Sequence, residues 1–242
     1  MRVAVLSDVH ANLRALETVL AEVDREQPDA LWCLGDIVGY GPKPTECREL
    51  VEARADVCLA GNHDLGALGV IDTGDFVADA EASARWTAGE LTEADRQFLG
   101  SLPVQTELEQ ASLYHGSPRD PVWEYVLTAD TALAALDAAP VSPVLVGHSH
   151  VALAILLHRG ELTGGLAPIG TEIDLDAGSW LLNPGSVGQP RDGDPRAAWL
   201  LIDFEAARAV FRRVPYDIAA TQREIIEAGL PEGLAARLET GT

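Results

Sequence analysis

Short apolar runs that end in polar residues recur along the first 150 residues. The runs cover residues 3–6, 30–34, 57–60, 113–114 and 144–146, and each is followed within two positions by Asp, Asn or His. Apolar runs of this length, without alternation, are typical of buried strands. The pattern therefore predicts five strands that each deliver a polar side chain at the carboxyl end.

Helical spacing separates the first three runs. Leu13, Leu16, Leu20 and Val23 predict an amphipathic helix over residues 12–26. Pro44 is favourable at the first position of a second helix, where its missing N–H costs nothing. Strands that alternate with helices favour a parallel sheet with right-handed crossovers, and hence an α/β fold.

The pattern changes twice further on. Residues 65–103 are rich in Ala and Glu and predict a helical, cap-like insertion, in which Thr92 and Asp95 form a capping box. Residues 131–138 predict another helix. After His150 we expect strands over 151–158, 166–175, 179–182 and 197–203, and an amphipathic helix over 218–238. Without linkers or repeats, residues 1–242 are expected to form a single domain.

Charge restricts the possible partners. The 242 residues include 17 basic and 38 acidic ones, a net charge of −21. Such a chain is poorly suited to duplex nucleic acid or to anionic membranes. Lys43 is the only lysine, which excludes a Walker-type phosphate loop. An anionic substrate would therefore need bound metal ions to neutralise it.

Cysteines and the N-terminus bear on location. Cys33, Cys47 and Cys58 form no C-x-x-C motif and are read as buried thiols in a reducing compartment. The first apolar run is too short for a signal peptide or a membrane span. A cytoplasmic location is expected. The oligomeric state stays open, because residues 152–157 suit either the core or a dimer edge.

The polar residues after the runs match a metal site. Carboxyl ends of parallel strands meet in one crevice, where ligands bind. Asp, Asn and neutral His suit Mn²⁺, Fe²⁺, Zn²⁺ or Ni²⁺. Seven candidates are too many for one ion, but two ions about 3.5–4 Å apart, with a carboxylate between them, would use all of them. The candidates are Asp8, His10, Asp36, Asn62, His115, His148 and His150.

Each motif alone also has a plain structural explanation. Asp8 could cap a helix, and Gly35-Asp36 could form a turn. The sequence G-H-S-H could be a mononuclear site or a hydrogen-bonded histidine pair. His158 has no motif around it and is expected in solvent. The ordered set of five motifs is what favours the metal site.

That order, D-V-H, G-D-I-V-G, G-N-H-D, H-G and G-H-S-H, resembles the calcineurin-like metallophosphoesterase superfamily, and within it the small bacterial phosphodiesterase-like branch. The resemblance extends to about residue 190 through residues 183–186, Asn-Pro-Gly-Ser. It implies a four-layer α/β/β/α sandwich with a di-metal site at the strand carboxyl ends.

The resemblance also implies roles for individual residues. Asp36 would bridge the two ions, and His63 would protonate the leaving oxygen or orient the phosphate. The first ion would be held by Asp8, His10, Asp36 and His150, and the second would be completed by Asn62, His115 and His148.

Two departures distinguish this chain from the phosphoprotein phosphatases of the superfamily. Gly39 stands where they carry an Asp, so His63 lacks that carboxylate partner, and residues 65–71 contain no Arg. The loss of basic clamps favours a singly charged diester over a monoester.

Other residues are candidates for supporting roles. Phosphate contact or support for the ligands is possible at Arg119, Arg191, Asn12, Asp64 and Ser186, the alternatives being solvated arginines, helix capping and turn formation. Base stacking or core packing is possible at Tyr40, Trp86, Trp123 and Tyr125.

The sequence thus favours a metal-dependent phosphoesterase, and most of all a phosphodiesterase. It would hydrolyse a small, nucleotide-like phosphate ester by attack of a metal-bridging hydroxide. One alternative is a phosphomonoesterase or protein phosphatase of the same fold. Another is a non-catalytic metal-binding scaffold, although no expected ligand is missing. A barrel amidohydrolase would require an early H-x-H, which here comes late.

Overall fold

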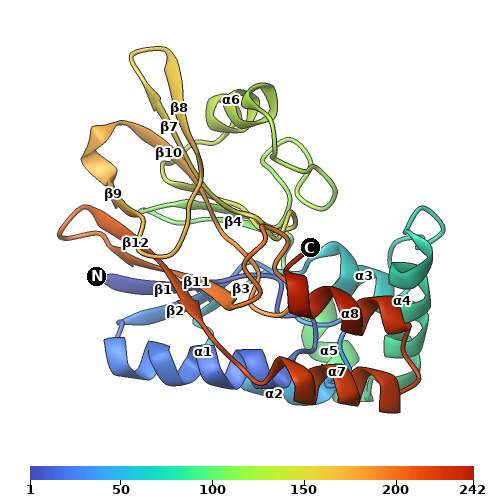
Figure 1. The fold of residues 1–242 in the computed structure, drawn as a ribbon. Coiled ribbons are helices and arrows are strands. Elements are labelled where there is room, and N and C mark those ends of the chain that lie inside the picture. The colour runs from blue at the N-terminus through green and yellow to red at the C-terminus, as the bar shows by residue number, and fades with distance from the viewer.

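Two six-stranded sheets pack face to face, with helices on both outer sides (Figure 1). This computed structural model describes all 242 residues. The first sheet has the order β3 (Val57–Cys58), β2 (Ala30–Cys33), β1 (Arg2–Leu6), β11 (Ala197–Asp203), β12 (Arg208–Val214) and β9 (Glu172–Asp174). The second has the order β4 (Gln105–Glu107), β5 (Ser112–Tyr114), β6 (Val144–Leu145), β10 (Ser179–Pro184), β7 (Ala152–His158) and β8 (Glu161–Leu166).

Helices cover the outer faces, which completes the predicted four-layer α/β/β/α arrangement. The first sheet is covered by α1 (Leu13–Glu26) and α2 (Pro44–Arg54), and the second by α6 (Ala129–Ala138). The remaining helices are α3 (Asn62–Ala67), α4 (Ala78–Glu90), α5 (Glu93–Ser101), α7 (Ile218–Glu227) and α8 (Glu232–Thr240), with a short 3-10 turn at Leu175–Ala177.

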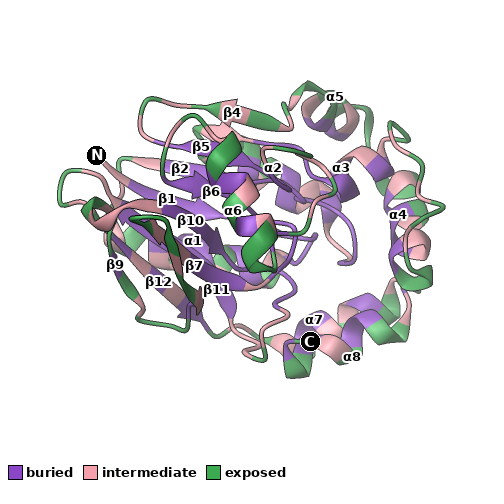
Figure 2. Cartoon of the chain, turned by 90° about the horizontal axis from the view of Figure 1, so that it is seen from above, coloured by how far each residue is buried: buried purple, intermediate pink, exposed green.

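Strand β1 lies at the centre of the first sheet. It runs parallel to β2 and antiparallel to β11. Val3 and Val5 point into the core between the sheets, while Ala4 and Leu6 belong to the core under α1. Figure 2 shows that buried residues are concentrated in these strands. The unbroken apolar run thus reflects a strand with both faces covered.

The helix signals in the sequence are confirmed. The Asn12 side chain caps α1 by accepting a hydrogen bond from the Ala15 amide at 3.2 Å. Pro44 is the first residue of α2. Thr92 and Asp95 form the expected capping box of α5.

Several predicted boundaries are wrong. Of the strand expected at 166–175, only residues 172–174 form one, because the chain turns at Pro168 and Gly170, where the backbone φ of Gly170 is +81°. Strand β8, over residues 161–166, was not predicted. The runs at 57–60 and 144–146 form strands of only two residues. Strands β4 and β12 were not predicted. In β12 the alternation is masked by three arginines, of which Arg208 and Arg212 are partly exposed, while Arg213 is buried and ion-paired with Asp192.

The C-terminal tail is a pair of helices rather than one. Gly229, with a φ of +74°, and Pro231 end α7 and start α8. The pair packs with α4 around Tyr40, and Figure 2 shows these helices at one edge of the molecule. No helix has the length and apolarity to cross a membrane.

Candidate metal centre

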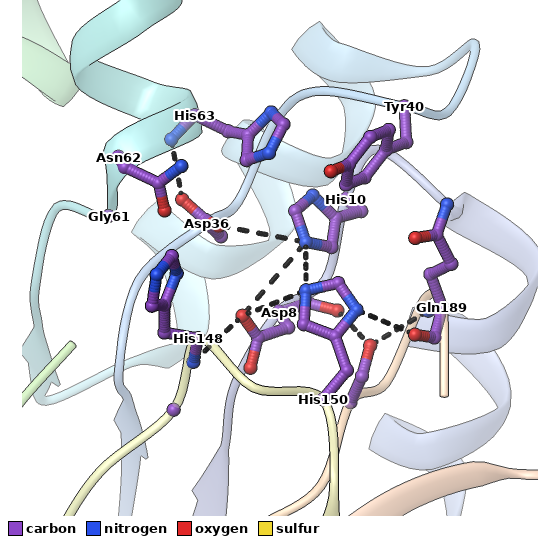
Figure 3. Close-up of polar contacts among 12 residues, drawn as sticks. Asp8, His10, Asp36, Tyr40, Gly61, Asn62, His63, His148, His150 and Gln189 are labelled. Atoms are coloured by element: carbon purple, nitrogen blue, oxygen red, sulfur yellow. Dashed lines mark hydrogen bonds and ion pairs between the residues drawn. The ribbon is translucent and has the colours of Figure 1, made fainter. Parts of the chain in front are cut away.

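The polar residues after the five predicted strands meet at one end of the two sheets. Three strands of the first sheet and two of the second contribute them. All are buried, and the residues are Asp8, His10, Asp36, Asn62, His115, His148 and His150. Figure 3 shows all of these residues except His115.

Four of these residues form a first donor set. One ligand atom from each of Asp8, His10, Asp36 and His150 lies within 4.8 Å of the others. The Nε2 atoms of His10 and His150 are only 2.9 Å apart. Two buried imidazole nitrogens this close to each other, beside two carboxylates, suit a divalent ion.

A second donor set shares Asp36 with the first. It consists of Asp36, His115 and His148, again within 4.8 Å of one another. The Asn62 Oδ1 lies 3.1 Å from the His115 Nε2. The Asp36 Oδ2 is 3.6 Å from the His10 Nε2 and 3.4 Å from the His115 Nε2. One carboxylate oxygen therefore faces both sets.

The two carboxylates are held in the same way. The Asp8 Oδ1 accepts a hydrogen bond from the His148 amide at 3.2 Å, and the Asp36 Oδ1 accepts one from the His63 amide at 2.8 Å. The Oδ2 atoms of both are buried with no hydrogen-bond donor. A buried anionic oxygen without a partner is costly, and a bound cation would remove that cost.

Main-chain carbonyls orient the histidines. The Nδ1 atoms of His10, His115 and His150 lie 3.2, 2.9 and 2.7 Å from the carbonyl oxygens of Val38, Leu34 and Gln189, respectively. His148 is reversed, because its Nε2 lies 3.2 Å from the Trp123 carbonyl. A carbonyl can only accept, so these nitrogens are the protonated ones. The other nitrogen of each ring is left free for a metal.

Burial and Asp36 shift the pKa values of these groups. Burial raises the pKa of Asp8 to about 7 and lowers that of His148 to about 3. Burial also lowers the pKa of His10. At His115 burial alone would lower the pKa, but the charge and hydrogen bond of Asp36, the charge of Asp8 and the Leu34 carbonyl together outweigh burial and raise the pKa to about 9. A divalent ion bound there would replace that proton.

The ligand residues have unusual backbone conformations. Asp8, His10, Asp36, His148 and His150 all have φ between +49° and +62°. Residues other than glycine rarely adopt this left-handed region, and each instance costs about 1–3 kcal/mol. Such outliers persist where the surrounding structure imposes them, typically at functional sites.

Glycines leave room for Asp36 and His63. A Cβ at Gly61 would collide with the Asp36 carboxylate. A Cβ at Gly39, where φ is +87°, would lie 2.7 Å from the His63 Nδ1. That nitrogen is buried and has no partner, and burial lowers the pKa of His63 to about 4. The His63 ring packs against Tyr40 and Phe76, with centroids 4.3 and 4.9 Å away.

Three candidate supporting residues hold the loops. Asp64 accepts hydrogen bonds from the Val38 and Gly61 amides, at 3.0 and 2.9 Å. The Ser186 Oγ donates to the Asp8 carbonyl at 2.7 Å. Besides capping α1, the Asn12 side chain donates to the Gly188 carbonyl at 2.8 Å.

The two candidate arginines differ in their surroundings. Arg119 is half-exposed and ion-paired with Glu124. Arg191 lies beside the first donor set, where its Nη2 donates to the Tyr40 hydroxyl at 3.2 Å and to the Gln189 Oε1 at 2.8 Å.

The candidate aromatic residues also separate into two groups. Tyr40 and Trp86 pack in the cluster under α7 and α8. Trp123 and Tyr125 are 38% and 47% exposed. Tyr125 stacks on the His148 ring, with centroids 3.9 Å apart and planes at 21°.

Three neighbours of the site were not identified from the sequence. Gln189 orients His150, Phe76 packs on His63, and Arg237 donates to the Gln189 Oε1 at 3.3 Å. Only Gln189 had a local signal, since it lies three residues after Ser186.

Comparison with known proteins identifies the class. The calcineurin-like phosphoesterase superfamily domain matches residues 1–206, and the chain therefore belongs to this superfamily, as its motifs indicated. Helices α7 and α8 lie beyond the matched residues.

Individual relatives cover the whole chain. A metallophosphoesterase from Sphaerobacter thermophilus is 42% identical, with a TM-score of 0.91 over 100% of this chain and 99% of that one. An uncharacterized protein of Methanocaldococcus jannaschii is 35% identical over 250 residues, or 99% of this chain and 98% of its own. A hypothetical protein of Pyrococcus horikoshii, 21% identical, shares the fold with a TM-score of 0.82 over 100% of this chain and 98% of its own.

Proposed function

We propose that this protein is a phosphodiesterase that uses two divalent ions. The first ion would be held by Asp8, His10, Asp36 and His150, and the second by Asp36, Asn62, His115 and His148. The observation that carries the proposal is the Asp36 Oδ2. It is buried, has no donor, and lies within 3.6 Å of a histidine from each set.

The ligand set suits Mn²⁺, Fe²⁺, Zn²⁺ or Ni²⁺. Bound there, two such ions would neutralise the phosphate oxygens and lower the pKa of a water molecule, which provides a nucleophile at neutral pH. The free thiols support the expected cytoplasmic location.

The chain itself positions the ester. The unpartnered His63 Nδ1 would protonate the leaving oxygen or orient the phosphate. Arg191 would contact a phosphate group of the substrate from the side of Tyr40. Asp64, Ser186 and Asn12 keep the ligand loops in place.

A diester preference rests on what surrounds His63. Gly39 leaves no room for a carboxylate against the ring, and α3 contains no arginine. A dianionic monoester would therefore find little basic clamping on this side. The exposed rings of Trp123 and Tyr125 beside His148 support a nucleotide-like substrate.

The test is hydrolysis of bis(p-nitrophenyl) phosphate against p-nitrophenyl phosphate. Metal-stripped protein is resupplied with Mn²⁺, Ni²⁺, Zn²⁺ or Mg²⁺. We expect metal-restored turnover that favours the diester. A monoester preference would contradict the phosphodiesterase proposal, and bound ions without any turnover would support a scaffold.

A further inference from the structure

Most of the basic side chains of this acidic protein are paired. Twelve of the 17 form ion pairs with Asp or Glu. The five without such a partner are Arg96, Arg159, Arg191, Arg223 and Arg237. Two of these five, Arg191 and Arg237, meet at one glutamine.

The glutamine holds both guanidinium groups with one oxygen. The Gln189 Oε1 accepts from the Arg191 Nη2 at 2.8 Å and from the Arg237 Nη1 at 3.3 Å. Gln189 is 2% exposed, and the Arg191 Nε is buried without any partner. Two adjacent positive charges repel each other, so this arrangement favours an anion between them.

The arginine pair is continuous with the metal centre. The Gln189 carbonyl orients His150, and the Arg191 amide donates to the His150 carbonyl at 3.1 Å. The Tyr40 hydroxyl contacts Arg191, and the Tyr40 ring lies 4.6 Å from the His10 ring. In Figure 3, Gln189 and Tyr40 lie on the same side of His10. An anion bound by the arginine pair would therefore lie one side chain away from the candidate metal ligands His10 and His150.

Arg237 comes from α8, outside the residues that match the superfamily domain. Leu234 and Leu238 of the same helix pack in the cluster that contains Tyr40. Arg237 also lines an open groove of about 880 Å³ between α4 and α8. Asp79 lines that groove as well but forms no ion pair with Arg237. The groove gives a substrate group access to the arginine from solvent.

We propose that Arg191 and Arg237, held by Gln189, bind a second phosphate group of the substrate. The inference rests on the proposed hydrolysis of the first phosphate at the metal centre. Two guanidinium groups match a terminal phosphate dianion in charge and can each donate two hydrogen bonds. The preferred substrates are then nucleotide diesters that carry an additional phosphate.

The experiment compares two dinucleotides that differ only in this group. Metal-loaded enzyme is given thymidylyl-thymidine with and without a 5′-phosphate, and products are separated by chromatography. Charge-assisted contacts to the second phosphate should make kcat/KM about 10- to 100-fold higher for the 5′-phosphorylated dinucleotide than for the unphosphorylated one. Arg237→Gln should lower this ratio of the two kcat/KM values by about tenfold, mainly through KM. Arg237→Lys should restore part of it.

Arg223→Gln is the matched control. Arg223 is exposed on α7, has no ion pair, and carries the same charge as Arg237. Its removal should leave the ratio unchanged. A ratio near one in the wild type, or one unaffected by Arg237→Gln, would overturn the subsite. If the enzyme still hydrolyses bis(p-nitrophenyl) phosphate in that case, only the subsite is excluded and the phosphodiesterase proposal stands. If the wild-type enzyme hydrolyses no diester at all, the phosphodiesterase proposal itself is excluded.

Discussion

The two donor sets share one carboxylate but face different surroundings. The first, with His10 and His150, lies behind Tyr40, Gln189 and the C-terminal helices, and its neighbouring charge is Arg191. The second, with His115 and His148, opens toward Trp123 and Tyr125, which are 38% and 47% exposed. The difference indicates a division of labour. In the proposed function, the first side would recognise charge and the second would contact an organic group of the substrate.

Replacing the shared carboxylate should have the largest effect. Asp36→Asn removes the charge that faces both sets, so we expect loss of both ions and a fall in turnover of about 10³–10⁵-fold, equivalent to several kcal/mol. Asp8→Asn should weaken mainly the first ion. Metal content by mass spectrometry separates the two variants. Two tightly bound ions in Asp36→Asn would contradict the bridging role.

Replacing His63 tests the role of a residue that contacts neither ion in this proposal. His63→Ala should keep both ions and lower turnover by about 10²–10⁴-fold, the usual contribution of a general acid. Steady-state kinetics with matched metal analysis measures both quantities. Turnover near the wild-type rate would exclude His63 from the mechanism.

A change remote from both sets should affect stability instead. Asp95 is fully buried and pairs with Arg48, their closest atoms 2.6 Å apart. Asp95→Asn should lower the free energy of unfolding by about 1.5–3 kcal/mol, because it weakens charge-assisted hydrogen bonds at a buried site, although Arg48 keeps the more exposed Glu52 as a partner 2.7 Å away. Asp24→Asn, which removes an exposed partner of Arg54, should cost less than about 1 kcal/mol. Urea denaturation measures both.

The ion pair between Asp95 and Arg48 also makes the free energy of unfolding depend on pH. Burial opposes ionisation of Asp95, but hydrogen bonds from Thr45, Thr92 and Arg48 outweigh it and lower its pKa. The folded-state pKa is then below the unfolded value, so this stabilisation is complete above about pH 4 and is lost as the pH falls through the folded-state pKa. The difference between wild type and Asp95→Asn should shrink below pH 4. A difference that stayed constant there would contradict the ion pair.

The smallest effect is expected at the open rim. Tyr125→Ala should raise KM for bis(p-nitrophenyl) phosphate by about 5- to 30-fold, which corresponds to a stacking contribution of about 1–2 kcal/mol. Tyr125→Phe keeps the ring and should restore binding. Leu127→Ala, at a neighbouring position that is 53% exposed, serves as the control. Equal effects of Tyr125→Ala and Leu127→Ala on KM would mean that stacking on the Tyr125 ring does not contribute to substrate binding.

The sequence predicted the convergence of the seven polar residues because strand ends must meet where sheets are parallel. It also predicted the α5 capping box and left helix capping open as an alternative for Asn12; both caps depend on side chains only three residues apart. The contact between Arg191 and Arg237 was out of reach, since it depends on how α8 packs against Tyr40. The reversed ring of His148 was equally hidden, because a main-chain carbonyl at Trp123 determines it.

The position of β1 has a consequence for biosynthesis. This strand is translated well before its partner β11, which spans Ala197–Asp203, and the Asp8 carbonyl is bound by the Ser186 hydroxyl and by the Gly188 amide. Contacts between such distant segments form slowly and leave apolar strands exposed in the nascent chain. Asp8 cannot be held in place until those segments exist. We therefore expect the metal centre to be loaded only after β11 has been translated.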